Sequence, residues 1–209
     1  SYKRIWLIDL LTVGLLLSDI FAIGYRGDSS TLGFYMVRVS NFLNFTFLYG
    51  IAFYISFCVE YLLKFPEKGK IFILISKITS GIAIILNFIN LFIPIIYSFD
   101  DENKYYRLNG WYVTSVCLLV SIFMLSLVVI ARRKEMQDIV VFMLLLDILM
   151  PLIASVIQIF IYGMAITNIT LGITQIFLFM ILYKEQVRTI KERDSQLEEY
   201  NAKLLLSQV

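Results

Sequence analysis

The sequence predicts an all-α, polytopic membrane protein with six transmembrane helices, the last of which continues into a cytoplasmic coiled-coil helix. The first observation is composition: 59% of the 209 residues are hydrophobic and only 16% are charged, against ~45–50% and ~25% in soluble domains. The second is that the apolar residues form long runs, and about 20 residues suffice to cross a bilayer core. The third is that the residues after Tyr183 are highly charged and follow a seven-residue rhythm.

Six apolar runs meet the length requirement for a transmembrane helix. Barrel strands would be about half as long and would alternate polar and apolar residues, so the runs predict helices. The predicted spans are residues 5–25, 42–63 (with a helix that can begin as early as Thr31), 71–97, 113–131, 139–162 and 165–183.

The distribution of lysine and arginine predicts the orientation of these spans, because cytoplasmic loops are enriched in both residues. A cytoplasmic N-terminus places thirteen of them inside: Lys3, Arg4, Lys64, Lys68, Lys70, Arg132, Arg133, Lys134, Lys184, Arg188, Lys191, Arg193 and Lys203. Four fall outside, namely Arg26, Arg38, Lys104 and Arg107. An even number of spans then places both termini in the cytoplasm, and we expect a bacterial cytoplasmic (inner) membrane.

Several kinds of chemistry are missing from the sequence. There is no histidine, which excludes histidine-ligated metals, histidine acid–base catalysis and a phosphoacceptor histidine within these residues. Cys58 and Cys117 lie in apolar runs toward opposite faces of the membrane, which argues against a disulfide. With no Gly-rich phosphate loop and no nucleophile–base pair, we expect no catalytic residues, no metal, no cofactor and no nucleic-acid partner.

Ionisable residues inside predicted spans are costly and mark functional or pairing positions. Asp19 lies in the outer half of the first span and Arg38 near the outer start of the second. Because these helices are adjacent in the chain, we expect the two side chains to pair. The pair is interpreted either as a structural contact that sets helix register or as the rim of a ligand site.

Asp147 lies within the fifth predicted span, and Pro151 follows it by one helical turn. Proline cannot donate a hydrogen bond to the carbonyl of Asp147, so the sequence predicts a kink there. One interpretation is a polar switch point; the other is a structural kink with Asp147 bonded to a neighbouring helix, for which Lys77 is the expected partner.

Uncharged polar residues gather in the outer half of the predicted bundle. They predict either hydrogen bonds between helices or an outward-opening polar cavity with an aromatic wall. The candidate ligand-binding residues are Asp19, Arg38, Asn41, Asn44, Asn87, Asn90, Gln158, Asn168 and Thr174.

The seven-residue rhythm divides the chain into a sensor domain, residues 1–183, and a signalling helix, residues 184–209. The d positions are mostly apolar and the a positions mostly polar, which is typical of a weak parallel coiled coil. The d positions are Tyr183, Ile190, Leu197 and Leu204, and the a positions are Val187, Asp194, Asn201 and Gln208.

The last four residues, Leu206-Ser207-Gln208-Val209, resemble the lead-in to the kinase core of Lyt-type sensor histidine kinases. In that family a Ser-Gln-Ile/Val pair directly precedes a Pro-His-Phe segment that carries the phosphorylated histidine. The order of a membrane domain, a short charged coil and this lead-in is also similar to membrane sensors of Firmicutes-like bacteria with kinase or diguanylate cyclase outputs. The resemblance implies that an output domain follows Val209.

These features together predict the sensor and transmission module of a bacterial histidine kinase, which relays an extracellular or intramembrane stimulus through the sixth helix to a dimeric coil. The expected partners are membrane lipid, a second copy of the chain, and a ligand that can be a peptide, a small molecule or a lipid. The alternatives are a small transporter or channel and the sensor of a diguanylate cyclase. The residues expected to transmit the signal are Asp147, Pro151, Tyr183, Val187, Ile190, Asp194, Leu197, Asn201 and Leu204.

Overall fold

The structure, a computed structural model, describes residues 2–63, 69–160 and 166–207. The elements are helices α1 (Tyr2–Gly24), α2 (Thr31–Leu62), α3 (Lys70–Ile89), α4 (Asn109–Ala131), α5 (Asp138–Phe160) and α6 (Ile166–Ser207), a 3₁₀ turn (Arg133–Glu135), and strands β1 (Tyr97–Phe99) and β2 (Tyr105–Arg107). The prediction of a helical fold with several helices that could cross a membrane is confirmed, and a short β-hairpin is added to it.

Among the described residues, five helices, α1 to α5, are long and apolar enough to cross a membrane. The sixth predicted span is represented by a shorter apolar stretch, Ile166–Ile181, at the start of α6. That helix then continues for a total of 42 residues without a break at the expected domain boundary.

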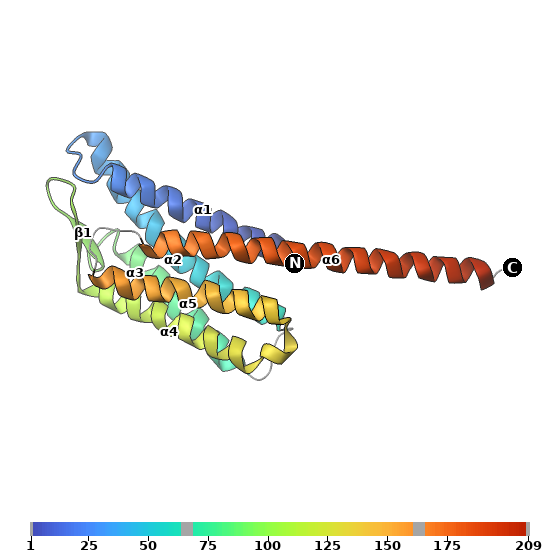
Figure 1. Cartoon of the computed structure of the whole chain (residues 1–209). Coiled ribbons are helices and arrows are strands. Elements are labelled where there is room, and N and C mark those ends of the chain that lie inside the picture. The colour runs from blue at the N-terminus through green and yellow to red at the C-terminus, as the bar shows by residue number, and fades with distance from the viewer. Residues whose placement is uncertain (1, 64–68, 161–165, 208–209) are drawn as a thin grey trace.

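The helices form an elongated bundle from which α6 projects as a single rod (Figure 1). The β-hairpin and the connection between α1 and α2 lie at one end of the bundle, and the rod leaves from the other end. The first turn of α1 lies at the end from which the rod leaves. Helix α1 packs against α2 and α6, α5 packs against α4 and α6, and α3 packs against α2 and α4.

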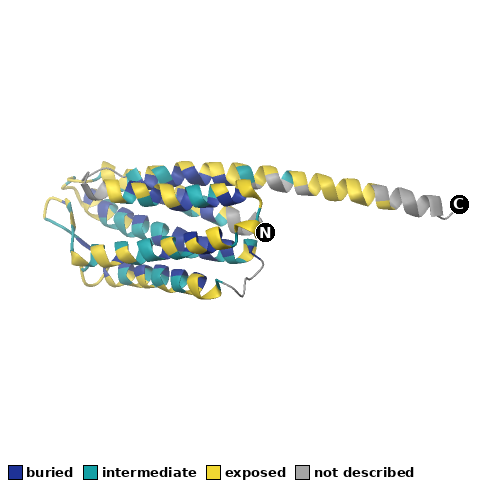
Figure 2. Cartoon of the chain, turned by 60° about the horizontal axis from the view of Figure 1, so that its bottom comes forward, coloured by how far each residue is buried: buried dark blue, intermediate teal, exposed yellow. Residues whose placement is uncertain are grey.

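The bundle has a buried apolar interior and an apolar outer surface. Leu15, Val59 and Val129 are fully buried at 0% exposure within one continuous cluster. Exposed residues run along the outward faces of the same helices (Figure 2), and they include Ile20 and Phe123. A large exposed apolar surface on a bundle of this length is expected where lipid covers the protein.

Four buried serines hold α2, α3 and α4 together at the centre of the bundle. The Ser76 hydroxyl lies 2.8 Å from that of Ser56 and 2.6 Å from that of Ser121, which lies 2.8 Å from that of Ser80. Small side chains let helices approach closely in a membrane, and hydroxyls then bond across the interface. These three helices therefore form a tightly linked unit.

The third span is shorter than predicted, because α3 ends at Ile89 rather than near Tyr97. The Asn90 side-chain oxygen accepts hydrogen bonds from the backbone N–H groups of Ile95 (2.7 Å) and Ile96 (2.6 Å). Pro94 supplies no N–H to extend a helix. Asn90 thus turns the chain out of α3 and into β1.

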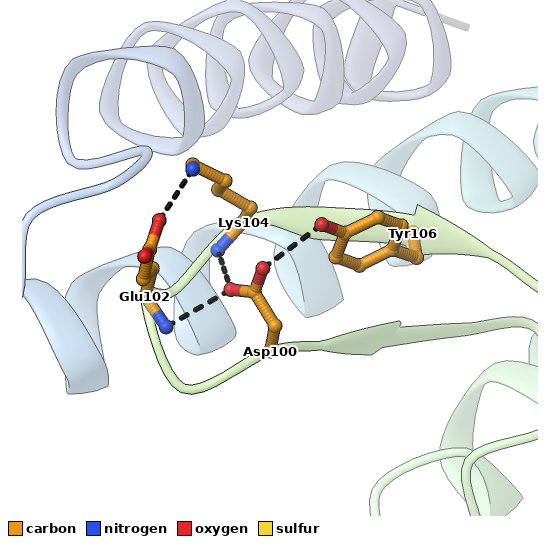
Figure 3. A network of polar contacts seen from close by, with 4 residues as sticks. All are labelled: Asp100, Glu102, Lys104 and Tyr106. Carbon is orange, nitrogen blue, oxygen red and sulfur yellow. Dashed lines mark hydrogen bonds and ion pairs between the residues drawn. The ribbon is translucent and has the colours of Figure 1, made fainter.

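The hairpin turn is organised by Asp100 (Figure 3). Its carboxylate accepts hydrogen bonds from the backbone N–H groups of Glu102 (3.0 Å) and Lys104 (2.8 Å) and from the Tyr106 hydroxyl (2.9 Å). The Lys104 and Glu102 side chains also form an ion pair. Asn103 adopts a φ of 58°, a left-handed conformation that asparagine tolerates better than most residues.

Two contacts fix the hairpin on the helices. Asn103 donates to the carbonyl of Asp28 (2.7 Å), which lies in the α1–α2 connection. At the start of α4, the N–H of Gly110 donates to the carbonyl of Ile95 (2.8 Å). A Cβ at Gly110 would lie 2.5 Å from that oxygen, so the approach requires glycine.

Candidate functional site

A cavity of about 200 Å³ lies at the hairpin end of the bundle. Residues from α1, α2, β2, α4, α5 and α6, and from the turn after α1, line it. They are Asp19, Ile23, Arg26, Asn41, Asn44, Phe45, Leu48, Tyr49, Tyr105, Arg107, Trp111, Ser115, Leu118, Leu119, Ile122, Ser155, Val156, Thr167 and Asn168. The cavity agrees with the second interpretation of the outer polar residues.

Four of the predicted ligand-binding residues line this cavity: Asp19, Asn41, Asn44 and Asn168. Three of them are bonded to one another. Asn44 donates to the Asp19 carboxylate (2.9 Å) and accepts from the Asn168 amide (3.3 Å), and the Asn168 side chain also bonds to Asp19. This polar triad joins α1, α2 and α6, so both interpretations of these residues, helix bridging and cavity lining, hold at once.

The predicted pairing of Asp19 with Arg38 is wrong. The Arg38 guanidinium donates to the Asn103 side chain (2.7 Å) and to the carbonyl of Phe34 (3.0 Å), and it lies 3.6 Å from the centre of the Phe34 ring. The hairpin provides a better partner for Arg38 than α1 does, and the sequence had shown no sign of the hairpin. Arg38 therefore holds the hairpin in place and does not line the cavity.

Three other predicted ligand-binding residues lie outside the cavity. Asn87 is fully buried and donates to the carbonyl of Phe42 (3.1 Å) and the Thr46 hydroxyl (2.9 Å), which joins α3 to α2. Asn90 shapes the turn after α3, and Thr174 bonds to Asp147. The side chain of Gln158 lies outside the described residues.

The sequence reasoning missed the residues that give the cavity its charge and its aromatic wall. From the sequence, Arg26 and Arg107 enter only the argument on orientation, and Tyr105 and Trp111 are not among the candidate ligand-binding residues. In the structure all four line the cavity, and the Arg107 guanidinium lies 4.3 Å from the centre of the Trp111 ring. The available signal in the sequence was the close spacing of Tyr105, Arg107 and Trp111 beside a short loop.

Stacked rings extend the aromatic wall from α2 to the hairpin. The Phe45 ring centre lies 5.9 Å from that of Tyr49 and 5.1 Å from that of Tyr97. Burial raises the pKa of the Tyr97 phenol to about 12, so this ring is neutral at physiological pH. The hairpin is thereby part of the cavity wall rather than a loose cover.

Asp147, which precedes the cavity-lining Ser155 on α5 by about two helical turns, forms the second polar element of the site. It is 2% exposed, and it accepts hydrogen bonds from the Thr174 hydroxyl (2.8 Å) and the Gln175 amide (2.7 Å) of α6. The expected bond to a neighbouring helix is confirmed, but Lys77 is the wrong partner, because its ammonium pairs with Glu60 at 2.6 Å.

A smaller cavity of about 30 Å³ shares part of its lining with the larger cavity and reaches Asp147. Asp147 and Pro151 line it, and it shares Ser155 and Thr167 with the larger cavity. The Ser155 and Thr167 hydroxyls lie 3.2 Å apart and link α5 to α6. A molecule in the larger cavity would therefore contact the α5–α6 interface at Ser155 and Thr167, about two helical turns along α5 from Asp147.

Across residues 2–63, 69–160 and 166–207, no group of three or more His, Cys, Asp or Glu side chains could hold a metal ion. The polar groups of the site are instead bonded across helix boundaries. Such bonds change when helices move.

The predicted coiled-coil positions lie on the projecting part of α6. Tyr183, Ile190 and Leu197 are 54%, 48% and 62% exposed, Val187 is half-buried and Asp194 is exposed. The side chains of Asn201, Leu204 and Gln208 lie outside the described residues, as does the end of the Leu206–Val209 motif. The coiled coil stays a prediction.

No protein-family model, curated protein or solved structure matches the chain.

Proposed function

We propose that the chain is the membrane sensor and transmission module of a bacterial histidine kinase. One observation carries the proposal: a cavity at one end of the bundle is connected, through the α5–α6 contacts, to a helix that leaves the opposite end as a rod. A stimulus in the cavity would act on Ser155 and Thr167, and from there on Asp147 and its two partners on α6.

The transmission step depends on one half of the bundle staying fixed while the other half moves. The serine cluster and the Lys77–Glu60 ion pair tie α2, α3 and α4 together. Helices α5 and α6 pack along their length, and the polar links between them are the bonds from Thr174 and Gln175 to the Asp147 carboxylate and the Ser155–Thr167 contact. Hydrogen bonds between membrane helices contribute about 0.6 kcal/mol each on average, so a change at the α5–α6 contacts can be driven by a bound ligand. The α5–α6 pair is therefore the element expected to shift.

The orientation of the module follows from the distribution of charge. The first turn of α1, the turn between α4 and α5 and the α6 rod lie at the end opposite the hairpin, and most of the lysines and arginines predicted to be cytoplasmic lie in or beside these segments of the sequence. In this arrangement α6 crosses the cytoplasmic membrane as the sixth span, the hairpin faces outward and the cavity opens to the exterior.

The kinase output is proposed from the resemblance at residues 206–209 and from the character of the rod. Apolar d positions and polar a positions make a dimer of two such rods weak. Two states of similar free energy can then be interconverted by a small displacement of α6.

A chimaera tests the proposal. The chain, continued after Ser207 by a histidine kinase core of known activity, is assayed for autophosphorylation in membrane vesicles. Replacing Asp194 and Asn201 with Ile strengthens the coil, and we expect autophosphorylation to lock at one level. Asp147→Ala, which removes the α5–α6 link, should change the basal level several-fold.

Phe142→Leu is the matched control, because Phe142 lies on α5 but is 57% exposed on its outer face. It should leave autophosphorylation unchanged. If the chimaera is active and none of the coil or Asp147 variants alters its activity, the proposed transmission role is rejected.

A further inference from the structure

We infer that the cavity binds a small amphiphile that carries one anionic group, a carboxylate or a phosphate, and a short apolar stem. The inference rests on the proposed sensor function and deepens it, because it names the ligand class. It is drawn from the order in which charged, polar and apolar residues line the cavity.

The outer end of the cavity is basic. Arg26 follows the end of α1 and is exposed, and Arg107 belongs to β2 and is half-buried. Trp111, under the Arg107 guanidinium, holds that side chain at the cavity wall. Two guanidinium groups at one cavity mouth suit a carboxylate or phosphate, which arginine binds in a bidentate manner.

Asp19, in the interior of the cavity, determines which end of the ligand stays at the mouth. Asp19 lies about 7 Å inside the end of α1 at Gly24, at ~1.5 Å per residue. Its carboxylate already accepts hydrogen bonds from Asn44 and Asn168, and it would repel a second anion at that depth. The anionic group is therefore held at the mouth, between the arginines.

The apolar wall accepts the stem. Leu118, Leu119 and Ile122 of α4 line the cavity opposite the polar triad, and Leu118 and Ile122 continue into the smaller cavity beside Pro151. Drug-sized ligands fill about 300–1,000 Å³. The volume here, about 200 Å³, suits a compact molecule or one end of a longer one. A stem of this kind would point toward the α5–α6 contacts.

The test uses Trp111 as a reporter of cavity occupancy. The chain has two tryptophans, and Trp6 is exposed on α1, so Trp6→Phe leaves Trp111 as the sole tryptophan. The chain in phosphatidylcholine nanodiscs is titrated with 6-bromohexanoate and with 6-bromohexanol, whose short stems keep the bromine close to the head group, where it quenches an adjacent tryptophan. We expect saturable quenching by the carboxylate and only gradual, non-saturating quenching by the alcohol.

Arginine variants connect the quenching to the cavity mouth. Arg26→Gln should weaken the apparent affinity for the carboxylate about tenfold or more, because a hydrogen bond to a charged group is lost. Arg107→Lys keeps the charge but loses the planar guanidinium that stacks on Trp111 and binds an anion in a bidentate manner, so it should weaken the binding less than Arg26→Gln does. Arg133→Gln removes an exposed arginine at the other end of the bundle and serves as the control, with unchanged affinity.

Changing the lipid composition of the nanodiscs distinguishes two sources of the anionic group, a bilayer lipid and a free amphiphile. If phosphatidylglycerol in the nanodiscs suppresses the saturable quenching, the site takes the phosphate of a bilayer lipid; if it does not, the site takes a free amphiphile. Unlabelled decanoate should compete in the parent chain and decanol should not, which covers the case in which an arginine variant fails to fold.

Equal quenching by the acid and the alcohol, or equal affinity in the Arg26→Gln and Arg133→Gln chains, would overturn the inference. The assay needs no output domain. Intact binding with an unresponsive chimaera would reject the transmission role alone, and a responsive chimaera without acid-selective quenching would reject the ligand class alone.

Discussion

Asp147 illustrates how a membrane bundle accommodates a buried carboxylate with a hydroxyl and an amide as its hydrogen-bond donors. Its two oxygens are each matched to one donor on α6, a hydroxyl and an amide. Removal of the carboxylate would take the acceptor from the buried Gln175 amide and leave the Thr174 hydroxyl with only the Leu171 carbonyl (3.1 Å), and unsatisfied polar groups are costly in a membrane interior. Asp147 therefore both positions α6 and makes that position sensitive to change.

We expect Asp147→Ala to lower the free energy of unfolding by about 1–3 kcal/mol, from two lost interhelical bonds and the unsatisfied Gln175 amide. The measurement is thermal unfolding of the purified chain in detergent. Asp147→Asn, which keeps one side-chain acceptor, should lose less. Ile153→Ala, on the outer face of α5, is the control for a simple loss of side-chain volume, and a loss as large as that of Asp147→Ala would contradict the assigned role.

Asn90 is a second residue whose local hydrogen bonds decide its role. It had been predicted as a ligand-binding residue, since an amide near a membrane surface is typical of a polar pocket. The structure instead uses its single oxygen to accept N–H groups from Ile95 and Ile96. Buried backbone N–H groups must find partners, so the residue serves the turn, and the turn in turn presents the hairpin to the cavity.

At the scale of elements, the β-hairpin is the feature that changes the interpretation of the outer surface. It brings Tyr105 and Arg107 to the cavity and supplies the partner of Arg38. Its turn depends on Asp100, whose pKa lies below its usual range, chiefly because the backbone N–H of Lys104 donates to its carboxylate, with further donation from Tyr106 and Glu102.

This lowered pKa predicts a pH dependence of the hairpin. A carboxylate whose pKa falls below the unfolded value, about 3.9 for aspartate, stabilises the turn at pH values above 3.9, and the contribution is lost as the pH falls through the lowered pKa. We expect the Asp100 carboxyl carbon to titrate below 3.9 in ¹³C NMR. The Tyr106 phenol should titrate above its ordinary value, because its hydroxyl donates to Asp100.

Tyr106→Phe supplies the check on that assignment. It removes one donor and should return the Asp100 pKa partway toward the ordinary value. An Asp100 carboxyl that titrates at 3.9 or above in the parent chain would show that the turn is not held as described.

Helix α6 is the other element of consequence. The seven-residue rhythm predicts its continuity past Tyr183, and the structure confirms one helix from Ile166 to Ser207. The pairing of its exposed d positions with a second copy remains a prediction, because a single chain contains only one side of that interface.

At the scale of the whole molecule, the two ends of the bundle carry different structural elements. The hairpin, the cavity and the acidic turn occupy one end, and the projecting rod and the first turn of α1 occupy the other. This polarity, together with the excess of lysine and arginine at the rod end, underlies the proposed orientation in the membrane.

Cysteine labelling tests the orientation. In a chain with both native cysteines replaced by Ser, Lys104→Cys should react with a membrane-impermeant maleimide in intact cells, and Arg133→Cys should react only after the cells are opened. Both positions are exposed, so a difference in labelling reports the side of the membrane. Reaction of Arg133→Cys in intact cells would show that the rod faces outward and would remove the proposed cytosolic output.

The sequence by itself determined the helical architecture, the approximate positions of the five helices long and apolar enough to cross a membrane, and the continuity of the last helix. Those features depend on run length and periodicity, which are local properties of the chain. Only the tertiary structure decided which polar groups meet: Asp19 with Asn44 and Asn168, Asp147 with α6, and Arg38 with the hairpin. Partner choice depends on helix rotation and on distances between segments far apart in sequence, and hydrophobic patterning within one segment carries no information about either.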